Sequence, residues 1–294
     1  MNGVVLIDKP GGCTSHDVVN RFRKLAGTKR VGHLGTLDPM ATGLLVLVTG
    51  TATRLAQYFG GEKKTYIAEI LLGCVSNTYD ADGDTQPTGI APPRDASAVM
   101  QALNEFRGTF LQVPPPVSAK KVAGVRAYKL ARQNVPVELK AVDVEISELE
   151  VLEMQLPKVS IRVSCSAGTY MRSLAHDVGR KLGCGALLAR LRRTRVGDFD
   201  VQNGHSLDRL AELALESRLT DIILPSRSLL PHMPSQYVDA LTEMQIRQGR
   251  EFRTSPFVVA PGAPLVKALS QATGELIAIG ELKIPNIYHP NTVL

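Results

Sequence analysis

Two stretches of the chain follow a period of two in their hydrophobic residues. Thr65 to Leu72 places Tyr66 and every second residue after it on one side, and Val159 to Cys165 alternates strictly between apolar and polar residues. This period predicts β-strands with one buried face, and Val142 to Leu152 is predicted to pair with the second of them. Tyr66 is either a core ring or a ring at the mouth of a site. The alternation favours a place in the core, whereas the neighbouring Lys63 and Lys64 are consistent with a place at the mouth of a site.

A third stretch, Leu44 to Val48, is an unbroken apolar run closed by Thr49 and Gly50. Its length and ending favour a strand buried on both faces, although a short buried helix has the same pattern. The preceding residues, VGHLGTLDPMATG, then form a loop in which glycines allow a ligand to approach the backbone closely. Asp38 in this loop is the only acidic residue between Asp17 and Glu62, which makes it a candidate for chemistry.

Apolar residues spaced three and four apart predict several helices. The first is expected to begin at Ser15 as its cap and to bury Val18, Val19 and Phe22. Strands and helices together predict an α/β (α+β) fold with a mixed, largely antiparallel sheet flanked by helices. The other predicted helices are Thr53 to Phe59, Arg94 to Phe106, a helix that ends at Leu182, and Ser206 to Leu213.

Arg172 stands in the first turn of the helix that ends at Leu182. Cations are favoured at the opposite, C-terminal end of a helix, so an arginine at this place is expected to have an anionic partner.

Basic residues are densest between Lys181 and Arg195, where leucines lie among them. Such a cluster fits a phosphate-binding face. Val113 to Ala127 is interrupted by prolines, carries further basic residues, and reads as an insertion that could move over a polyanion. Asp80 to Asp84 suggests a calcium loop, but its glycine comes fourth rather than sixth, so a hairpin or surface loop is the better interpretation.

The last part of the chain differs from the rest. Pro225 to Pro234 is proline-rich and is predicted to be a linker, and Val238 to Leu294 predicts a small β-rich module. Within that module the patterns predict a helix from Asp239 to Gln248 and strands at Phe257 to Val259, Pro264 to Leu269 and Glu275 to Gly280.

Composition narrows the function classes. The chain has 294 residues, which suits two domains, and its net charge of +6 favours a polyanionic partner. Its four cysteines form no CxxC pair, so neither a zinc site nor a disulfide framework is indicated. The sequence shows no signal peptide and no apolar stretch that would span a bilayer, so we expect a soluble cytoplasmic protein without a membrane partner.

Several blocks resemble the TruB family of tRNA pseudouridine synthases, in the family's order. The block GHLGTLDPMATGLL resembles the family's catalytic motif, and the resemblance runs from about Gly3 to Val196. The C-terminal tail is similar to the PUA module, so we expect a catalytic domain over residues 1–229 and a PUA-like RNA-binding domain over residues 230–294. The other matching blocks are GVVLIDKPGG, KKTYIAEILLG, CSAGTYMRSLAHDVGRKLGCGA and LRRTRVG.

The resemblance implies isomerisation of a uridine to pseudouridine at position 55 in the T-loop of tRNA, with no cofactor and no metal. The expected partner is the tRNA T-arm, without a guide RNA, and we expect a monomer. By this likeness Asp38 is the catalytic aspartate and Arg172 pairs with it, Tyr66 stacks on the flipped base, and His33 inserts into the T-loop. Tyr170 and Leu191 line the uracil pocket, and Lys9 in the DKP turn is a further substrate-binding candidate.

The basic residues expected to contact the RNA backbone are Lys120, Lys121, Arg190, Arg192 and Arg193. Two of these lie in Pro114 to Val135, which corresponds to the family's mobile RNA-clamping segment. The sequence departs from some members at Val117, where they carry tyrosine.

The chemistry requires Asp38 to be ionised, whether it attacks the sugar, attacks the base or removes a sugar proton, and the sequence leaves these three routes open. Burial would raise the pKa of Asp38, and an ion pair with Arg172 would lower it. Flipping the base out of its loop costs a few kcal/mol, which stacking side chains can offset.

Three other functions compete with this one. A guide-RNA-dependent relative shares the Gly-Thr-Leu-Asp-Pro motif, but the Met-Ala-Thr-Gly that follows it here is more similar to the stand-alone type. An RNA chaperone that folds tRNA, with modification secondary, is a second alternative. A metabolic enzyme unrelated to RNA has no phosphate loop, nucleotide fingerprint or nucleophile-base motif in its favour.

Overall fold

The computed structural model describes residues 1–117, 121–122, 125–126 and 139–294. Most of its strands lie in one ten-stranded sheet with the order β14-β1-β3-β12-β4-β11-β10-β7, to which β2 and β13 are attached. Every pairing in this sheet is antiparallel except that of β12 with β3, so the predicted mixed, largely antiparallel sheet is confirmed. Its strands are β1 (Gly3–Lys9), β2 (Val31–His33), β3 (Thr42–Thr49), β4 (Lys64–Leu72), β7 (Gly108–Gln112), β10 (Val142–Gln155), β11 (Lys158–Cys165), β12 (Ala186–Val196), β13 (Phe199–Asp200) and β14 (Leu224–Pro225).

Strand β3 is buried on both faces, as its unbroken apolar run predicts. Leu45 and Leu47 belong to one hydrophobic core, and Leu44, Val46 and Val48 belong to a second core on the other side of the sheet. Since a strand enclosed in this way can hardly shift, the loop that precedes it starts from a fixed point.

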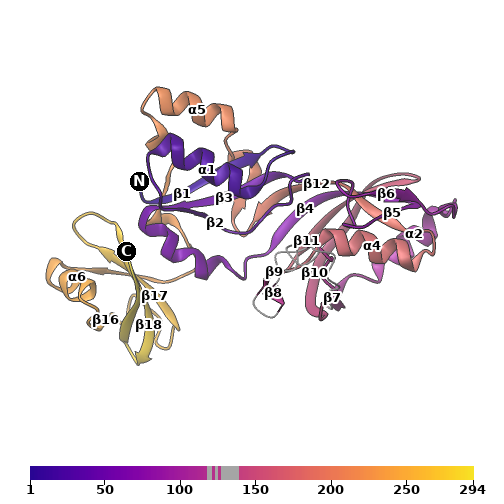
Figure 1. The fold of residues 1–294 in the computed structure, drawn as a ribbon. Coiled ribbons are helices and arrows are strands. Elements are labelled where there is room, and N and C mark those ends of the chain that lie inside the picture. Colours follow the sequence, from indigo (N-terminus) through magenta and orange to yellow (C-terminus); the bar gives the residue numbers. More distant parts are fainter. Residues whose placement is uncertain (118–120, 123–124, 127–138) are drawn as a thin grey trace.

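Helices cover the sheet at both ends, as Figure 1 shows, with α1 and α5 near β1 and β3, and α2 and α4 near β7 and β10. The predicted helix at 53–59 is a 3-10 helix, η1. The helix bounds are α1 (Ser15–Ala26), η1 (Gly50–Phe59), α2 (Ala96–Asn104), α4 (Met171–Lys181), η2 (Val201–Asn203), α5 (Leu207–Leu215), η3 (Leu219–Ile222) and η4 (Ser226–Ser228).

The cap of α1 is Thr14, not Ser15 as predicted. The Thr14 hydroxyl accepts the backbone N–H of Asp17, and the Asp17 carboxylate accepts the N–H of Thr14. Ser15 is free for another role. Its buried hydroxyl accepts the N–H of Leu37 and donates to the Leu37 carbonyl, which ties α1 to the loop that carries Asp38.

Two short hairpins lie outside the large sheet. Strands β5 (Cys74–Ser76) and β6 (Thr85–Pro87) pair, which confirms the hairpin interpretation of the aspartate-rich segment between them. Strands β8 (Lys121–Val122) and β9 (Val125–Arg126) pair inside the predicted insertion, most of which lies outside the described residues.

The C-terminal part is a five-stranded sheet, order β15-β17-β18-β19-β16, with one helix beside it. The β-rich module is therefore present, but the strand predicted at 257–259 is wrong, because this segment is a turn in which Phe257 is 97% exposed. The boundary between residues 229 and 230 stays a prediction. The elements are β15 (Ser235–Val238), α6 (Ala240–Arg247), β16 (Phe252–Arg253), β17 (Leu265–Ser270), β18 (Leu276–Ile284) and β19 (Ile287–Val293).

The proline-rich segment 225–234, predicted to be a linker, connects the two sheets and is anchored on both. Pro225 pairs with Gly3 of β1, and the buried side chain of Leu229 packs with Leu269 and Ile279 of the C-terminal sheet in the second core. The C-terminal sheet is thus held against the large sheet by apolar contacts. No helix in the described ranges has the length and apolar character needed to cross a membrane.

Candidate active site

Two glycines with positive φ shape the loop between β2 and β3 and the start of β3. Gly35 has φ +113° and Gly43 has φ +98°, which other residues rarely adopt. A Cβ on Gly43 would lie 2.2 Å from the carbonyl oxygen of Arg193 on the neighbouring strand β12. The loop therefore lies directly against β12, and it presents Asp38 at its turn, where the N–H of Ala41 donates to the Asp38 carbonyl.

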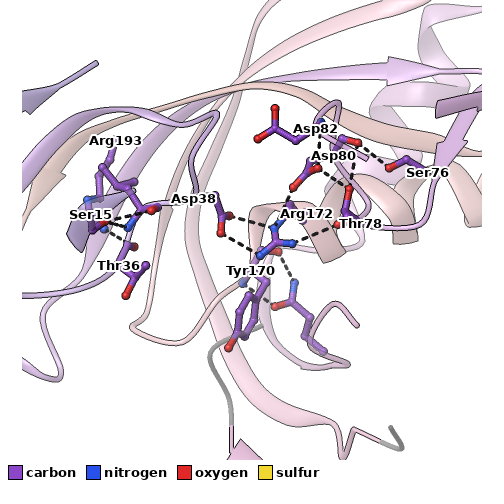
Figure 2. A network of polar contacts seen from close by, with 12 residues as sticks. Ser15, Thr36, Asp38, Ser76, Thr78, Asp80, Asp82, Tyr170, Arg172 and Arg193 are labelled. Atoms are coloured by element: carbon purple, nitrogen blue, oxygen red, sulfur yellow. Dashed lines mark hydrogen bonds and ion pairs between the residues drawn. The ribbon is translucent and has the colours of Figure 1, made fainter. Parts of the chain in front are cut away.

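Asp38 forms an ion pair with Arg172, the first-turn arginine for which an anionic partner was predicted (Figure 2). Arg172 Nη2 donates to Asp38 Oδ1 at 3.0 Å, and Arg172 Nε lies 3.0 Å from Asp38 Oδ2. The Arg172 side chain is 7% exposed, whereas that of Asp38 is 32% exposed. The buried cation thus holds a carboxylate whose other side remains accessible.

Arg172 has a second carboxylate partner, Asp80, which the sequence did not reveal. Arg172 Nε lies 3.5 Å from Asp80 Oδ2, and Arg172 Nη1 donates to the Thr78 carbonyl at 3.2 Å (Figure 2). The Asp80 side chain is only 6% exposed. One arginine therefore lies between two aspartates, and the described part of this cluster has a net charge of −1.

Asp80 is itself fixed by the hairpin in which it lies. Its Oδ1 accepts the hydroxyl of Thr78 at 2.5 Å and the N–H of Asp82 at 3.2 Å. The hairpin is fastened to β12, because the N–H of Ala81 donates to the Leu188 carbonyl and the N–H of Leu188 donates to the Tyr79 carbonyl. The aspartate run reads as a surface loop in the sequence, and only its contact with β12 turns Asp80 inward.

Burial raises the pKa of Asp38, and the nearby carboxylate of Asp80 raises it further, while Arg172 opposes both. The net shift is upward. Asp38 is thus less acidic than an ordinary aspartate, and Arg172 is the group that favours its ionised form.

A cavity of about 340 Å³ opens beside Asp38. It brings together five of the residues that were predicted to act in catalysis or to bind the base, which are Asp38, Tyr66, Tyr170, Arg172 and Leu191. Tyr66 is both a core and a cavity residue, because it is 7% exposed and still lines the cavity wall. Burial raises the pKa of Tyr66, so its hydroxyl stays protonated at neutral pH.

Tyr170 caps α4, and its backbone is clamped from β7. The buried side chain of Gln112 donates through Nε2 to the Tyr170 carbonyl at 3.1 Å and accepts the Tyr170 N–H at 2.8 Å. Within the first turn of α4 the Ser173 hydroxyl donates to the Val113 carbonyl at 2.7 Å. These bonds fix the start of α4, and with it the position of Arg172.

The prediction that Lys9 binds substrate has to be corrected. It is 0% exposed, and its ammonium donates to the carbonyls of Pro10, Cys13 and Pro39 at 2.8, 2.7 and 3.3 Å. Lys9 therefore joins the DKP turn to the residue after Asp38 and has no access to the cavity. His33 does not line the cavity either. Burial lowers the pKa of its imidazole, and its insertion into RNA stays a prediction.

The prediction that Arg193 contacts the RNA backbone has to be corrected. It is 0% exposed, and its guanidinium donates to the carbonyls of Leu44, Thr36 and Gly35 at 2.8, 3.3 and 3.1 Å. It holds the Asp38 loop from the side of β12. A signal for this was present in the sequence, because on a strand the period of two places Arg193 on the same face as the apolar Leu191.

The other basic residues differ in what the structure says of them. Arg190 is exposed, and Arg192 is half-buried in a bidentate pair with Asp8 at 3.0 and 2.8 Å, so both remain candidates for RNA contact. Lys120 lies outside the described residues, as does the side chain of Lys121. Among the described residues, no group of three or more His, Cys, Asp or Glu side chains could hold a metal ion.

The chain matches two family models that together cover this site. Residues 23–171 match the model of the TruB family pseudouridylate synthase (N terminal domain), and residues 172–231 match that of the tRNA pseudouridylate synthase B C-terminal domain. The chain belongs to the TruB family. Asp38 falls within the first match and Arg172 at the beginning of the second, so the ion pair joins the two matched regions.

Individual relatives match the whole length of this TruB family member. A tRNA pseudouridine synthase B of Solibacter usitatus is 50% identical over 294 residues, which are 100% of both chains. One of Dehalococcoides mccartyi is 38% identical over 293 residues, which are 100% of this chain and 96% of the relative. A solved structure of an H/ACA ribonucleoprotein bound to a substrate RNA containing 2′-deoxyuridine has a TM-score of 0.71 and 26% identity, covering 99% of this chain and 84% of that chain.

Proposed function

We propose that this protein isomerises the uridine at position 55 in the T-loop of tRNA to pseudouridine, with Asp38 as the catalytic carboxylate and without a guide RNA. The observation that carries the proposal is the pairing of Asp38 with Arg172 at the edge of a cavity lined by Tyr66 and Tyr170. Membership of the TruB family and the full-length likeness to proteins named tRNA pseudouridine synthase B support the substrate class.

The reaction needs little beyond a base-binding cavity and one ionised acid. The C1′–N1 bond breaks, the uracil turns and a C5–C1′ bond forms. C5 then loses its proton to a base, and N1, which no longer carries the sugar, gains a proton, so the overall number of protons is unchanged. Asp38 can serve as the nucleophile or base only as a carboxylate, and Arg172 favours that form. The Tyr66 ring offers a flat surface for the flipped base, and stacking of this kind contributes about 1–3 kcal/mol.

Independence from a guide RNA is supported by the degree of likeness. The chain is 50% identical to a tRNA pseudouridine synthase B over its whole length, against 26% for the chain from the H/ACA particle. We further propose that the protein acts as a cytoplasmic monomer on the T-arm. The exposed Arg190 and the half-buried Arg192 are among the described basic residues near the site that the RNA backbone can reach.

The test is to incubate the purified protein with unmodified tRNA alone and to map pseudouridine in the product. We expect one modified position, at 55, and no product in a tRNA that carries cytidine there. Tritium release from C5-labelled uridine gives the rate. Modification elsewhere, or a requirement for an added RNA, would contradict the proposal.

Asp38→Asn is expected to abolish tritium release while binding of tRNA persists. The fold should survive, because the raised pKa of Asp38 means that ionised Asp38 costs stability at neutral pH, and asparagine removes that cost. Asp84→Asn is the matched control, since Asp84 lies in the same aspartate run, is exposed, and does not contact Arg172. Substantial turnover by Asp38→Asn would exclude Asp38 as the catalytic group.

A further inference from the structure

The cavity beside Asp38 is lined by three cations, which are Lys64, Arg172 and Arg193. Two of them are already occupied. Arg172 lies between the carboxylates of Asp38 and Asp80, and Arg193 is fully buried with three backbone carbonyls around its guanidinium. Neither has a charge that a substrate can reach and neutralise.

Lys64 differs from both. It begins β4 and is half-buried, and among the described residues its ammonium donates to a single group, the Glu62 carbonyl, at 2.9 Å. Within the part of the chain that the structure describes, no carboxylate oxygen lies within 4 Å of Lys64 Nζ. The ammonium keeps two further N–H donors for a ligand.

The surroundings of Lys64 make its charge costly in the absence of a ligand. Burial lowers the pKa of Lys64, and the neighbouring guanidinium of Arg193 lowers it further. Gly35 has no side chain between them, because a Cβ there would lie 3.5 Å from Lys64 Cε and 3.6 Å from Arg193 Nη1. Lys64 and Arg193 thus lie close together at the cavity wall, and an anion bound by Lys64 would offset their repulsion.

The position of Lys64 relative to Tyr66 indicates which anion fits. The two residues are separated by one position on β4, so their side chains leave the same face of the sheet about 7 Å apart. If a flipped base stacks on the Tyr66 ring, the sugar of the same nucleotide spans this distance and brings its phosphate to the ammonium.

We propose that Lys64 binds a phosphodiester group that flanks the nucleotide whose base enters the cavity. This inference rests on the proposed function for the identity of the RNA, and it assigns to Lys64 the anchoring of the target nucleotide rather than the chemical step. Phosphate contacts of this kind fix the register of a nucleic acid without reading its sequence.

The experiment is a binding cycle between protein and RNA variants. Synthetic T-arm hairpins are prepared with a neutral methylphosphonate at the phosphate 5′ or 3′ of the target uridine, and binding is measured in the Asp38→Asn background so that no turnover intervenes. Lys64→Met keeps the length of the side chain and removes its charge. Lys63→Met is the matched control, since Lys63 is the adjacent, exposed lysine outside the cavity.

Lys64→Met should weaken binding of the unmodified hairpin by about tenfold, as expected for a charged hydrogen bond. It should also reduce the slope of log affinity against log salt by about 0.7 to 0.9, the value for one phosphate. On one of the two methylphosphonate hairpins it should have no further effect, whereas Lys63→Met should weaken all hairpins alike. Lys64→Arg should retain most of the affinity.

The proposal is overturned if Lys64→Met loses the same affinity on every hairpin. It is also overturned if affinity and slope are unchanged, including the case in which Lys64→Met lowers the single-turnover rate of protein that retains Asp38. Should Lys64→Met fail to fold, Lys64→Gln enters the same cycle. Because the cycle reads binding alone, failure of the wild-type protein to form pseudouridine would overturn the proposed function and leave the assignment of Lys64 standing.

Discussion

Two arginines hold the Asp38 loop from opposite sides, and they do so by different means (Figure 2). Arg172 contacts it through the side-chain carboxylate of Asp38, and Arg193 through the backbone carbonyls of Gly35 and Thr36. Carboxylates titrate and carbonyls do not. The Arg172 side of the loop therefore responds to pH, while the Arg193 side fixes the backbone at any pH.

The difference also separates chemistry from architecture. Removing Arg172 leaves Asp38 and Asp80 without a cation, which changes the charge state of the reacting group. Removing Arg193 takes a buried donor away from three backbone carbonyls, which changes the stability of the loop. Substitutions at the two positions should therefore fail in different ways.

Arg172→Met is expected to have the largest effect, a loss of about 10²- to 10³-fold in single-turnover rate near neutral pH. Arg172 lowers the pKa of Asp38, so without it that pKa rises further and less of Asp38 is ionised. The lost rate should recover in part as the pH is raised, and Arg172→Lys should lose less. A loss of equal size at every pH would show that Arg172 acts by position alone.

Arg193→Met is expected to lower the free energy of unfolding by about 3 kcal/mol, because three backbone carbonyls lose the hydrogen bonds of one buried guanidinium. Denaturant unfolding measures this, and any loss of rate should be independent of pH. Arg192→Met is the control on the same strand, where the partly exposed pair with Asp8 contributes about 1 kcal/mol or less. A stable Arg193→Met protein would contradict the supporting role.

Asp80→Asn is expected to have the smallest effect, and it acts on the pH profile. Asp38 is active as a carboxylate, so the rate should fall as the pH drops through its raised pKa, at a higher pH than for an exposed aspartate. Asp80 is one of the groups that raise that pKa, so Asp80→Asn should move the fall to lower pH. Asp82→Asn should cause a smaller shift in the same direction, and a shift to higher pH in either variant would contradict this account.

The sequence predicted the parts of the fold that local patterns determine. The period of two identified β4 and β11, and the unbroken apolar run identified β3. The pairing of Arg172 with an acid followed from the helix dipole, which needs no knowledge of the fold. Phe257 was placed in a strand because an apolar run alone does not distinguish a strand from an exposed turn.

The site features that could not be predicted from the sequence depend on contacts between segments that are distant in the chain. Asp80 becomes a site residue only because its hairpin is fastened to β12. Lys9 is a cation near the site, yet the carbonyls that enclose it come from two separate turns, and its burial cannot be read from its neighbours in the chain. A basic residue in a basic cluster suggests RNA by its charge, whereas its hydrogen-bond partners decide its role.

The clamp at Gln112 has a consequence for how the chain can be altered. Gln112 is the register partner of Val142, so the end of β7 and the start of β10 lie side by side, and the chain between them begins and ends at one point of the sheet. The bonds from Gln112 to Tyr170 and from Ser173 to Val113 fasten that point to α4. Lengthening such a connection twofold costs only about 0.6 kcal/mol of closure entropy. This position is therefore a natural graft point, where a tag, a sensor or a foreign RNA-binding segment can be inserted while the frame of the catalytic loop stays in place.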